Sequence, residues 1–482
     1  MHLSPVVNVV GVLLIVLGAA QAVPMGVAVY FGESDWFYLG VSGIISLGVG
    51  VLMTIFSKGA PEISERDGFF VVTLAWLFAA AVGALPYVLT GTIGSLTDAI
   101  FESMSGFTTT GATILTNFQG VGQGIFLWRS MTQWFGGMGI IVLALVILPA
   151  LGIGGMQLFK REVPGPYSEK LTPRLRDTAR ALWSVYLGIT VVEGVVFYLL
   201  GMTPMEAINH ALTTVSTAGF STRPDSIGGF QSPALEWAMI VFMVIGGINF
   251  SLHYRLFTHP RARIPHFRDN EFVWYLSAII LASLAMVAYL AAIKGYSPSA
   301  AATKGTFQVV SILTTSGFVS DDYVPWGAFP QILLVMLMIA GGCAGSTSGG
   351  IKWVRILLVF KYIYLELLRL IHPRLVVHAK LNHMNVSQDI LSNIFAFIFL
   401  FLTTLGVVTL LISLDGHSFL TSMGAAVSAL SNIGPGLDAV GPVENYAHLS
   451  SYAKWVLILA MLMGRLELMT VIVLFMPFTW RR

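Results

Sequence analysis

Residues 108–111 read Thr-Thr-Thr-Gly, a hydroxyl-rich stretch that ends in glycine inside an otherwise apolar sequence. The pattern returns as Ser-Thr-Ala-Gly at 216–219, Thr-Thr-Ser-Gly at 314–317 and Ser-Asn-Ile-Gly at 431–434. We call these four stretches the glycine segments. They follow one another at intervals of about 100 residues, which is typical of a chain built from repeated units. One polar loop in each of four units would surround an axis with four equivalent pieces of backbone.

The composition places these loops in a membrane protein. Of 482 residues, 56% are hydrophobic and 10% are charged, and the mean hydropathy is +0.80. A soluble domain carries roughly a quarter charged residues. A spanning helix needs about 20 mostly apolar residues. Ten segments meet that condition and are predicted to span: 5–30, 37–57, 69–91, 124–150, 179–201, 234–256, 272–294, 328–351, 391–414 and 452–478.

A short amphipathic segment precedes each glycine segment and a long apolar one follows it. The short segments cannot cross a bilayer, so we expect re-entrant half-helices at 96–107, 204–215, 300–313 and 419–430. The predicted fold is an all-α polytopic membrane protein, in which four repeats of helix, half-helix, loop and helix surround one pore. Two N-terminal helices are expected in 1–60, followed by repeats at 61–160, 161–262, 263–383 and 384–482.

The positive charges predict the orientation of the chain. Most of the 26 Lys and Arg residues fall in 58–66, 160–180, 255–268, 352–380 and 481–482. Such segments stay in the cytoplasm, so both termini are expected there and the glycine segments enter from outside. The outer stretches hold more acids than bases, which would concentrate cations at the mouth. The alternative explanation is the positive-inside rule, which by itself leaves few Lys and Arg residues in outer loops whether or not those loops attract cations.

The glycine segments have the chemistry of a cation filter. Glycine adopts positive φ readily, which lets consecutive carbonyls point toward one axis. A ring of four carbonyls can replace the hydration shell of potassium. Close helix packing through small residues is the alternative, but four segments in register favour the pore. The predicted potassium ligands, mainly through backbone carbonyls, are Thr109, Thr110, Gly111, Thr217, Ala218, Gly219, Thr315, Ser316, Gly317, Asn432, Ile433 and Gly434.

A gate is predicted below this filter. Residues 341–350, the glycine-rich loop, hold five glycines and three hydroxyls in the middle of an apolar segment, which predicts an irregular break. The glycines assigned to the gate are Gly341, Gly342, Gly345, Gly349 and Gly350. Arg465 lies at the corresponding place of the fourth repeat and is predicted to face the pore as an electrostatic barrier. A structural ion pair is its alternative, although Glu467, two residues away, does not face it on a helix.

The segments Ser105–Ala112, Ser216–Ser221, Thr314–Phe318 and Ser431–Gly436 carry a resemblance that extends over nearly the whole chain. The chain resembles the Trk/Ktr/HKT superfamily of potassium transporters, and most of all its TrkH branch of bacterial Trk membrane subunits. The resemblance implies potassium uptake across the bacterial inner membrane, by a homodimer docked on a cytosolic TrkA-type ring that binds NAD or ATP. It also implies an intramembrane gating loop at 341–350. Within the superfamily, serine at the first filter position is associated with sodium preference, so Gly111 favours potassium.

The filter departs from that of a potassium channel. None of the four segments contains Thr-Val-Gly-Tyr-Gly, and the residues that follow the glycines are unequal: Ala112, Phe220, Phe318 and Pro435. With one glycine in each segment, we expect fewer ordered ion sites than in a potassium channel.

Two other classes of function remain as alternatives. A proton- or sodium-coupled symporter would use paired acids within the membrane, and only Glu193 and Glu467 qualify. An enzyme would need a nucleophile with its base, or a metal set, and neither pattern occurs in the sequence. We therefore expect a transporter with potassium as its ion, membrane lipid around it and no nucleic-acid partner.

Overall fold

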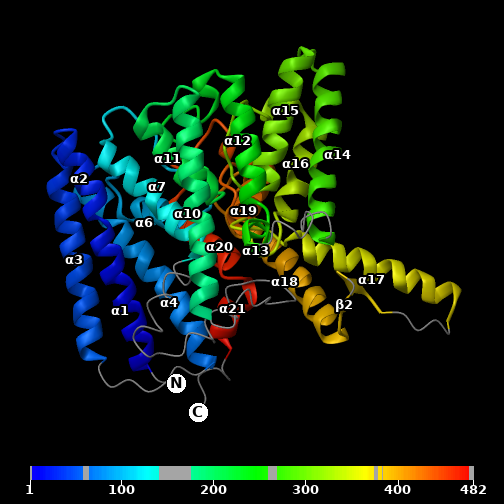
Figure 1. The fold of residues 1–482 in the computed structure, drawn as a ribbon, viewed down its shortest axis with the longest axis horizontal. Coiled ribbons are helices and arrows are strands. Elements are labelled where there is room, and N and C mark those ends of the chain that lie inside the picture. Colours follow the sequence, from blue (N-terminus) through cyan, green and yellow to red (C-terminus); the bar gives the residue numbers. More distant parts are fainter. Residues whose placement is uncertain are drawn as a thin grey trace.

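The computed structural model describes residues 3–57, 65–139, 175–258, 269–373, 378–382 and 384–476 (Figure 1). Its main helices are α1 (Leu3–Ala20), α2 (Ala22–Tyr30), α3 (Asp35–Phe56), α4 (Glu65–Gly83), α5 (Leu85–Leu89), α6 (Leu96–Phe107), α7 (Gln123–Gly137), α10 (Leu175–Leu199), α11 (Pro204–Val215), α12 (Pro233–Gly246), α13 (Phe250–Thr258), α14 (Asn270–Ala292), α15 (Pro298–Leu313), α16 (Ala328–Ala340), α17 (Trp353–Ile371), α18 (Gln388–Ser413), α19 (Phe419–Ser431), α20 (Ser451–Arg465) and α21 (Leu468–Ile472). The short strands β1 (Lys380–Leu381) and β2 (Met384–Asn385) pair in antiparallel fashion. The all-α fold class is confirmed.

Six stretches of the described chain are long and apolar enough to cross a membrane: Ser4–Tyr30, Asp35–Phe56, Asp67–Leu89, Ala179–Leu199, Asn270–Ala292 and Gln388–Ser413. Two further predicted spans are broken rather than continuous. Pro233–Gly246 meets Phe250–Leu256 at 98°, and Ser451–Arg465 meets Leu468–Phe475 at 115°.

The prediction of continuous spans at 234–256 and 452–478 is therefore wrong, whereas the break within 328–351 agrees with the irregular loop predicted at 341–350. The predicted span 328–351 is helical only as far as Ala340, where Gly341 takes a φ of 71° that ends the helix. At the second break, Glu467 has a φ of 62°. The part of the predicted span 124–150 beyond residue 139 lies outside the described residues.

The four half-helices are α6, α11, α15 and α19, and each lies where the sequence predicts it, with α15 beginning two residues early. Three of them start at a hydroxyl cap: Thr203 accepts from Glu206 N, Ser297 from Ala300 N and Ser418 from Thr421 N. The cap at Thr203 is a complete capping box, and Pro204 occupies the first helical position, where its missing N–H costs nothing. These local signals explain why the starts are readable from sequence.

Each half-helix packs between the first helix of its own repeat and the second helix of the preceding repeat. Thus α11 lies between α10 and α7, α15 between α14 and α12, and α19 between α18 and α16. The half-helix α6 closes the cycle, because it packs between α4 and α20 of the last repeat. This cyclic order is what four repeats around one axis require.

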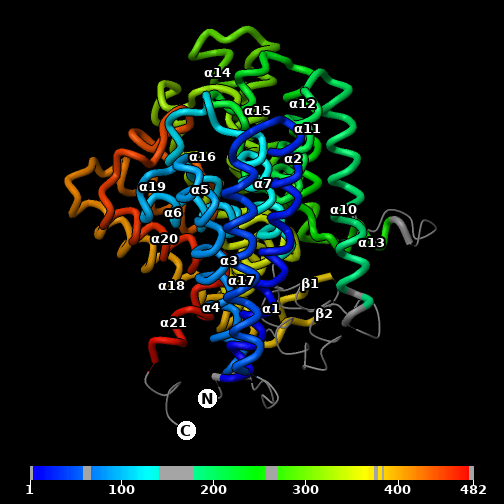
Figure 2. Tube along the Cα trace, turned by 90° about the vertical axis from the view of Figure 1, so that its left-hand side faces the viewer, coloured from blue at the N-terminus to red at the C-terminus, as the bar shows by residue number. Residues whose placement is uncertain are grey.

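The two N-terminal spans lie outside this cycle. Helix α1 packs along α3 and α4, and α2 packs on α7, so α1–α3 cover one side of the first repeat (Figure 2). Glycines bring α1 and α3 close together. A Cβ atom on Gly18 would lie 2.8 Å from the carbonyl oxygen of Gly43, and one on Gly11 2.8 Å from that of Gly50.

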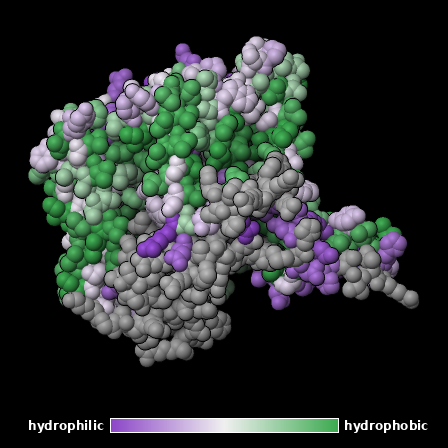
Figure 3. Space-filling view, in the orientation of Figure 1, coloured by the Kyte–Doolittle hydropathy of each residue, from purple (hydrophilic) through white to green (hydrophobic). Residues whose placement is uncertain are grey.

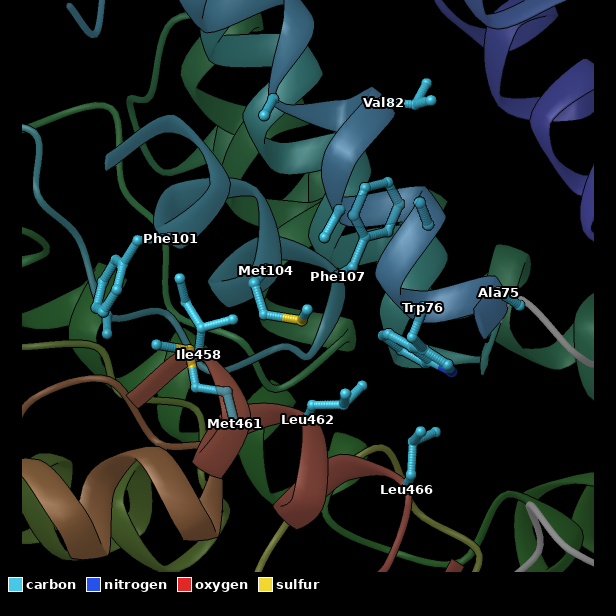
Figure 4. Packing of buried hydrophobic residues seen from close by; sticks show 14 of the residues in the cluster. Ala75, Trp76, Val82, Phe101, Met104, Phe107, Ile458, Met461, Leu462 and Leu466 are labelled. Carbon is cyan, nitrogen blue, oxygen red and sulfur yellow. The ribbon is translucent and has the colours of Figure 1, made fainter. Parts of the chain in front are cut away.

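The core and the surface have the character of a membrane protein. Met104 and Phe107 of α6 pack with Trp76 of α4 and with Met461 and Leu462 of α20, where the first and last repeats meet (Figure 4). The outer faces of α3, α10 and α14 carry large exposed apolar side chains. Hydrophobic residues cover most of the coloured face above the grey region, with hydrophilic ones along the top margin (Figure 3). This surface is suited to lipid.

Candidate ion-conducting site

All four glycine segments leave their half-helix through the same turn. The residue before each glycine donates its N–H to the carbonyl five residues earlier: Thr110 to Ser105 (2.9 Å), Ala218 to Thr213 (3.0 Å), Ser316 to Ser311 (2.8 Å) and Ile433 to Ser428 (3.0 Å). The residue two before each glycine is left-handed: Thr109 (φ 55°), Thr217 (49°), Thr315 (57°) and Asn432 (54°). This is a Schellman motif, in which the left-handed position usually holds glycine. Here the glycine comes two residues later.

The glycines also have positive φ, as predicted, and they approach the neighbouring segments in a closed cycle. A Cβ atom on Gly111 would overlap the carbonyl oxygen of Ala218, one on Gly219 that of Ser316, and one on Gly317 that of Ile433. The cycle closes because a Cβ atom on Gly434 would lie 2.8 Å from the carbonyl oxygen of Thr110. The structure thus brings the four predicted filter segments together around one centre.

Bonds behind the segments make the four unequal. Gln133 of α7 holds the second segment, since its Nε2 donates to Ala218 O (2.8 Å) and its Oε1 accepts from Phe220 N (3.0 Å). In the fourth segment, Ser428 Oγ and Tyr446 Oη both donate to Gly434 O (2.7 Å each). A backbone carbonyl has two lone pairs. Ala218 O accepts one hydrogen bond and therefore keeps one lone pair for an ion. Gly434 O accepts two hydrogen bonds and has no free lone pair, contrary to its predicted role as a ligand.

Four of the acids predicted for the outer mouth instead form ion pairs. The pairs are Glu102–Arg129 (2.6 Å), Glu206–Arg223 (2.7 Å), Glu236–Lys304 (2.7 Å) and Asp98–Lys454 (2.6 Å). In the first pair both side chains are buried, and Arg129 Nη1 also donates to Ser221 O (2.9 Å) of the next repeat. The charges of these four acids are balanced by their partners, so the predicted attraction at the mouth must come from other carboxylates.

Asp438 is one carboxylate that remains exposed beyond the fourth segment. The hydroxyls of Ser418 (2.5 Å) and Thr421 (2.8 Å) donate to its Oδ2. These hydrogen bonds hold the pKa of Asp438 below its ordinary value of 3.8. The side chain is therefore a fixed negative charge at neutral pH.

The glycine-rich loop separates α16 from α17 and lies directly against the inner ends of three glycine segments. Thr217 Oγ1 donates to Thr347 Oγ1 (3.0 Å), Ser348 Oγ donates to Thr314 O (2.7 Å), and Gly349 N donates to Thr315 Oγ1 (2.8 Å). A Cβ atom on Gly349 would overlap the carbonyl oxygen of Ser431 in the fourth segment. The irregular break predicted at 341–350 is thus present, with positive φ at Gly341, Gly345 and Gly350.

Arg465, the last residue of α20, joins this loop to the first repeat. Its Nη1 donates to Thr347 O (2.7 Å), and its Nη2 donates to Gly136 O (2.5 Å) and Gly137 O (2.9 Å) at the end of α7. The loop and Arg465 together therefore contact all four repeats. Glu467 pairs with Arg355 (2.5 Å) and not with Arg465; the two residues do not share a helix, because α20 ends at Arg465 and Glu467 lies at the bend with a φ of 62°.

Other candidate chemistry is sparse in the described part of the chain. Within those residues no group of three or more His, Cys, Asp or Glu side chains could hold a metal ion. Glu193 is completely buried in α10. His210 Nδ1 of α11 donates to Glu206 O (2.8 Å) and its Nε2 bonds to Ser221 Oγ (3.0 Å), which gives His210 a role in packing behind the second segment.

The comparisons with known proteins agree with this geometry. A family model described as TrkH, cation transport protein, matches residues 41–482. The chain belongs to the TrkH family. It is 38% identical over 486 residues to the Trk system potassium uptake protein TrkH of Escherichia coli strain K12, covering 100% of both chains. It is 38% identical over 482 residues to the Trk system potassium uptake protein TrkI of Halomonas elongata, covering 99% of this chain and 97% of that one.

The fold of this TrkH-family chain matches a solved structure over its full length. The crystal structure of the potassium transporter TrkH from Vibrio parahaemolyticus aligns with a TM-score of 0.89 and 36% sequence identity, covering 100% of both chains. The family consists of membrane transporters rather than enzymes, so the enzyme alternative is excluded.

Several supporting residues of this TrkH-family chain escaped the sequence prediction. Gln133 and Tyr446 lie in segments that read as ordinary helix and outer loop, and their partners are distant in sequence. A signal for Gln133 does exist, because an amide within an apolar helix needs a polar partner. The left-handed threonines carry no such signal, since their residue type disfavours that conformation.

Proposed function

We propose that this protein carries potassium into the bacterial cell along the axis enclosed by the four glycine segments. The observation that supports this most strongly is the closed cycle in which each filter glycine meets the carbonyl before the glycine of the next segment. Those carbonyls belong to Thr110, Ala218, Ser316 and Ile433. Carbonyls gathered in this way can replace the hydration shell of potassium. The similar proteins named as potassium uptake proteins point to the same ion.

The gate is proposed to be the glycine-rich loop with Arg465. The loop bonds to the inner ends of the segments, so ions cannot leave the filter on that side without its movement. Arg465 adds a positive charge on the same path, which repels a cation more strongly at low dielectric than in water. The described conformation corresponds to the closed state in this proposal.

The orientation and the partners follow from the basic segments. We propose that the side of the chain with segments 58–66, 160–180, 255–268 and 352–380 faces the cytoplasm, with both termini, at the bacterial inner membrane. There a homodimer would dock on a cytosolic nucleotide-binding ring of the TrkA type. Of these basic segments, 58–64, 160–174, 259–268 and 374–377 lie outside the described residues. Contact with lipid headgroups is the simpler use of the same charge.

This docking is testable by charge reversal. Replacing Arg174, Arg176 and Arg263 with Glu should reduce co-purification with a TrkA-type ring, since an acidic docking face would then be repelled. Unchanged co-purification would assign these charges to lipid or to topology alone. Folding is monitored by the dimer peak in detergent.

A proton- or sodium-coupled symporter remains the second candidate. The observation in its favour is Glu193, a carboxyl buried at membrane depth beside Val215 at the end of α11. Coupled transport would require that potassium flux follow a proton or sodium gradient.

Flux into proteoliposomes separates the two. We expect potassium entry that follows the potassium electrochemical gradient, exceeds sodium entry, and continues when the proton and sodium gradients are collapsed. Flux that stops when either gradient is removed would establish coupling. The absence of potassium flux in folded protein, with and without the cytosolic ring, would contradict the proposed function.

A further inference from the structure

Glu271, in the first turn of α14, contacts both the glycine-rich loop and the helix that follows it. Its Oε1 accepts from Ala344 N (2.6 Å) within the loop and from Val354 N (2.9 Å) in the first turn of α17. The residue is only 7% exposed. A single carboxylate oxygen therefore fixes the loop relative to the helix that follows it.

The chemistry of these contacts makes them strong. The first N–H groups of a helix have no partner inside the helix, and its N-terminus attracts negative charge. Val354 N is such a group, and Ala344 N lies in irregular backbone. The carboxyl oxygen of Glu271 supplies both N–H groups with the acceptor that their own backbone lacks. Conversely, a buried carboxylate that lost these donors would be costly, so Glu271 and the loop hold each other in place.

The same end of α14 is joined to the β1–β2 hairpin. Asn382, in the turn of the hairpin, donates from Nδ2 to Asp269 Oδ2 (2.8 Å) and accepts at Oδ1 from Asn270 N (2.9 Å). Asp269 also caps α14, because its Oδ1 accepts from Phe272 N (3.0 Å). A continuous series of bonds thus runs from the hairpin through Asp269, Asn270 and Glu271 to the loop.

The loop has two other anchors of a different kind. Lys352 Nζ donates to Ser348 O (2.8 Å), and Arg465 Nη1 donates to Thr347 O (2.7 Å). Both are basic side chains that donate to carbonyls of the loop. Glu271 holds an N–H from the side of α14, which is the side connected to the hairpin.

We propose that Glu271 is the positioning residue that keeps the glycine-rich loop closed, and that the hairpin turn at Asn382 controls it. A displacement of the hairpin would shift the start of α14, withdraw the carboxylate from Ala344 N and free the loop. This mechanism rests on the proposed function, in which the loop is the gate, and it gives that gate a connection to the face proposed to be cytoplasmic.

The native Cys343 reports on loop position independently of transport. It is the single cysteine of the chain, it is 1% exposed, and it precedes Ala344. The test is the rate at which N-ethylmaleimide modifies Cys343 in the full-length protein in proteoliposomes. One hydrogen bond contributes a factor of about 5 to an equilibrium, and Glu271 makes two. We therefore expect Glu271→Ala to raise the rate about tenfold or more, and Glu271→Gln, which keeps an acceptor oxygen, to raise it less.

Asn382→Ala tests the connection to the hairpin. It should also raise the modification rate, and the double variant with Glu271→Ala should react no faster than Glu271→Ala alone, because both act on one series of bonds. The control is Asp389→Ala, which removes an exposed carboxylate from the first turn of α18 and should react at the parental rate. The potassium-to-sodium flux ratio should stay unchanged in all variants. A general loosening of the structure would instead change this ratio, because it would also disturb the filter.

Parental modification rates in both Glu271→Ala and Asn382→Ala would overturn the proposal, and additive effects would remove the hairpin from it. If Glu271→Ala does not give folded protein, the test uses Glu271→Gln and Asn382→Ala. Parental modification rates in both of these variants would then overturn the proposal. Loss of potassium flux in the parental protein would contradict the proposed function while leaving the modification rates interpretable.

Discussion

At the residue scale, the least expected feature is threonine in a left-handed conformation. Thr109, Thr217 and Thr315 each occupy the position where a helix end normally has glycine. This conformation costs roughly 1–2 kcal/mol for a residue with a Cβ atom. Such strain persists at functional sites where the surroundings fix it. For two of these threonines the benefit is visible, because their hydroxyls bond to the glycine-rich loop.

The filter glycines should not tolerate a side chain. Gly317→Ser would place a Cβ atom on the carbonyl oxygen of Ile433 at a φ of 71°. We expect the potassium-to-sodium flux ratio to fall roughly tenfold, since a left-handed side chain alone costs about 1 kcal/mol and the overlap adds to it. Gly188→Ser is the matched control, because no atom lies within 4 Å of a Cβ atom there. Equal flux ratios in Gly317→Ser and the parent would argue against the four-segment filter.

The buried pair Glu102–Arg129 should matter more for stability than an exposed pair. Removing one partner of a buried pair leaves an uncompensated charge and costs about 3–5 kcal/mol. Arg129→Met should therefore lower the unfolding midpoint in detergent strongly. Glu366→Gln breaks the half-exposed pair with Arg369 and should cost no more than about 1 kcal/mol. Similar midpoints for the two variants would mean that Glu102 is satisfied by Thr113 and Ile114 N alone.

At the element scale, the starts of the half-helices and the break at 341–350 were predictable, whereas the bends after Gly246 and Arg465 were not predicted. Thr203, Ser297 and Ser418 are local signals, since a cap acts on its own helix. The bend after Gly246 falls at Gly-Gly-Ile-Asn (246–249), where Asn249 Oδ1 accepts from Ser251 N (2.9 Å) in the first turn of the next helix. This local signal is weaker than the long apolar run around it, and the close approach of Gly246 to Thr217 is visible only in the structure. The glycine-rich loop was predictable because its own composition excludes a helix.

The glycine-rich loop and Arg465 should act as one barrier. Arg465→Ala removes the bonds to Thr347, Gly136 and Gly137 together with a positive charge near the path. We expect several-fold faster potassium flux without the cytosolic partner, at an unchanged potassium-to-sodium ratio. Shortening the loop should have a similar effect that shrinks once Arg465 is absent. The measurement is flux into proteoliposomes, with Arg369→Ala as the surface control.

A different outcome for Arg465→Ala would identify a structural arginine. If flux and the folded dimer are lost together, the three carbonyl bonds hold the fold rather than the gate. The barrier would then have to be sought in Lys352, whose Nζ bonds to Ser348 O.

At the scale of the whole molecule, one polar loop in each of four repeats was sufficient to predict the architecture. The structure adds the cyclic contacts, in which each half-helix packs against the second helix of the preceding repeat and α20 returns to α6. It also shows that the four segments differ in the hydrogen bonds that hold them. The two donors to Gly434 O come from α19 and from the outer loop at Tyr446. No sequence pattern predicts that a filter carbonyl turns toward the protein.

The central claim is that the four glycine segments hold potassium between them. Crystals grown in rubidium, which replaces potassium and scatters anomalously, test this most directly. We predict an anomalous peak on the axis, within coordination distance of the carbonyls of Thr110, Ala218, Ser316 and Ile433 and away from Gly434 O. The absence of any peak between the segments, in crystals of protein that transports rubidium in proteoliposomes, would contradict the account.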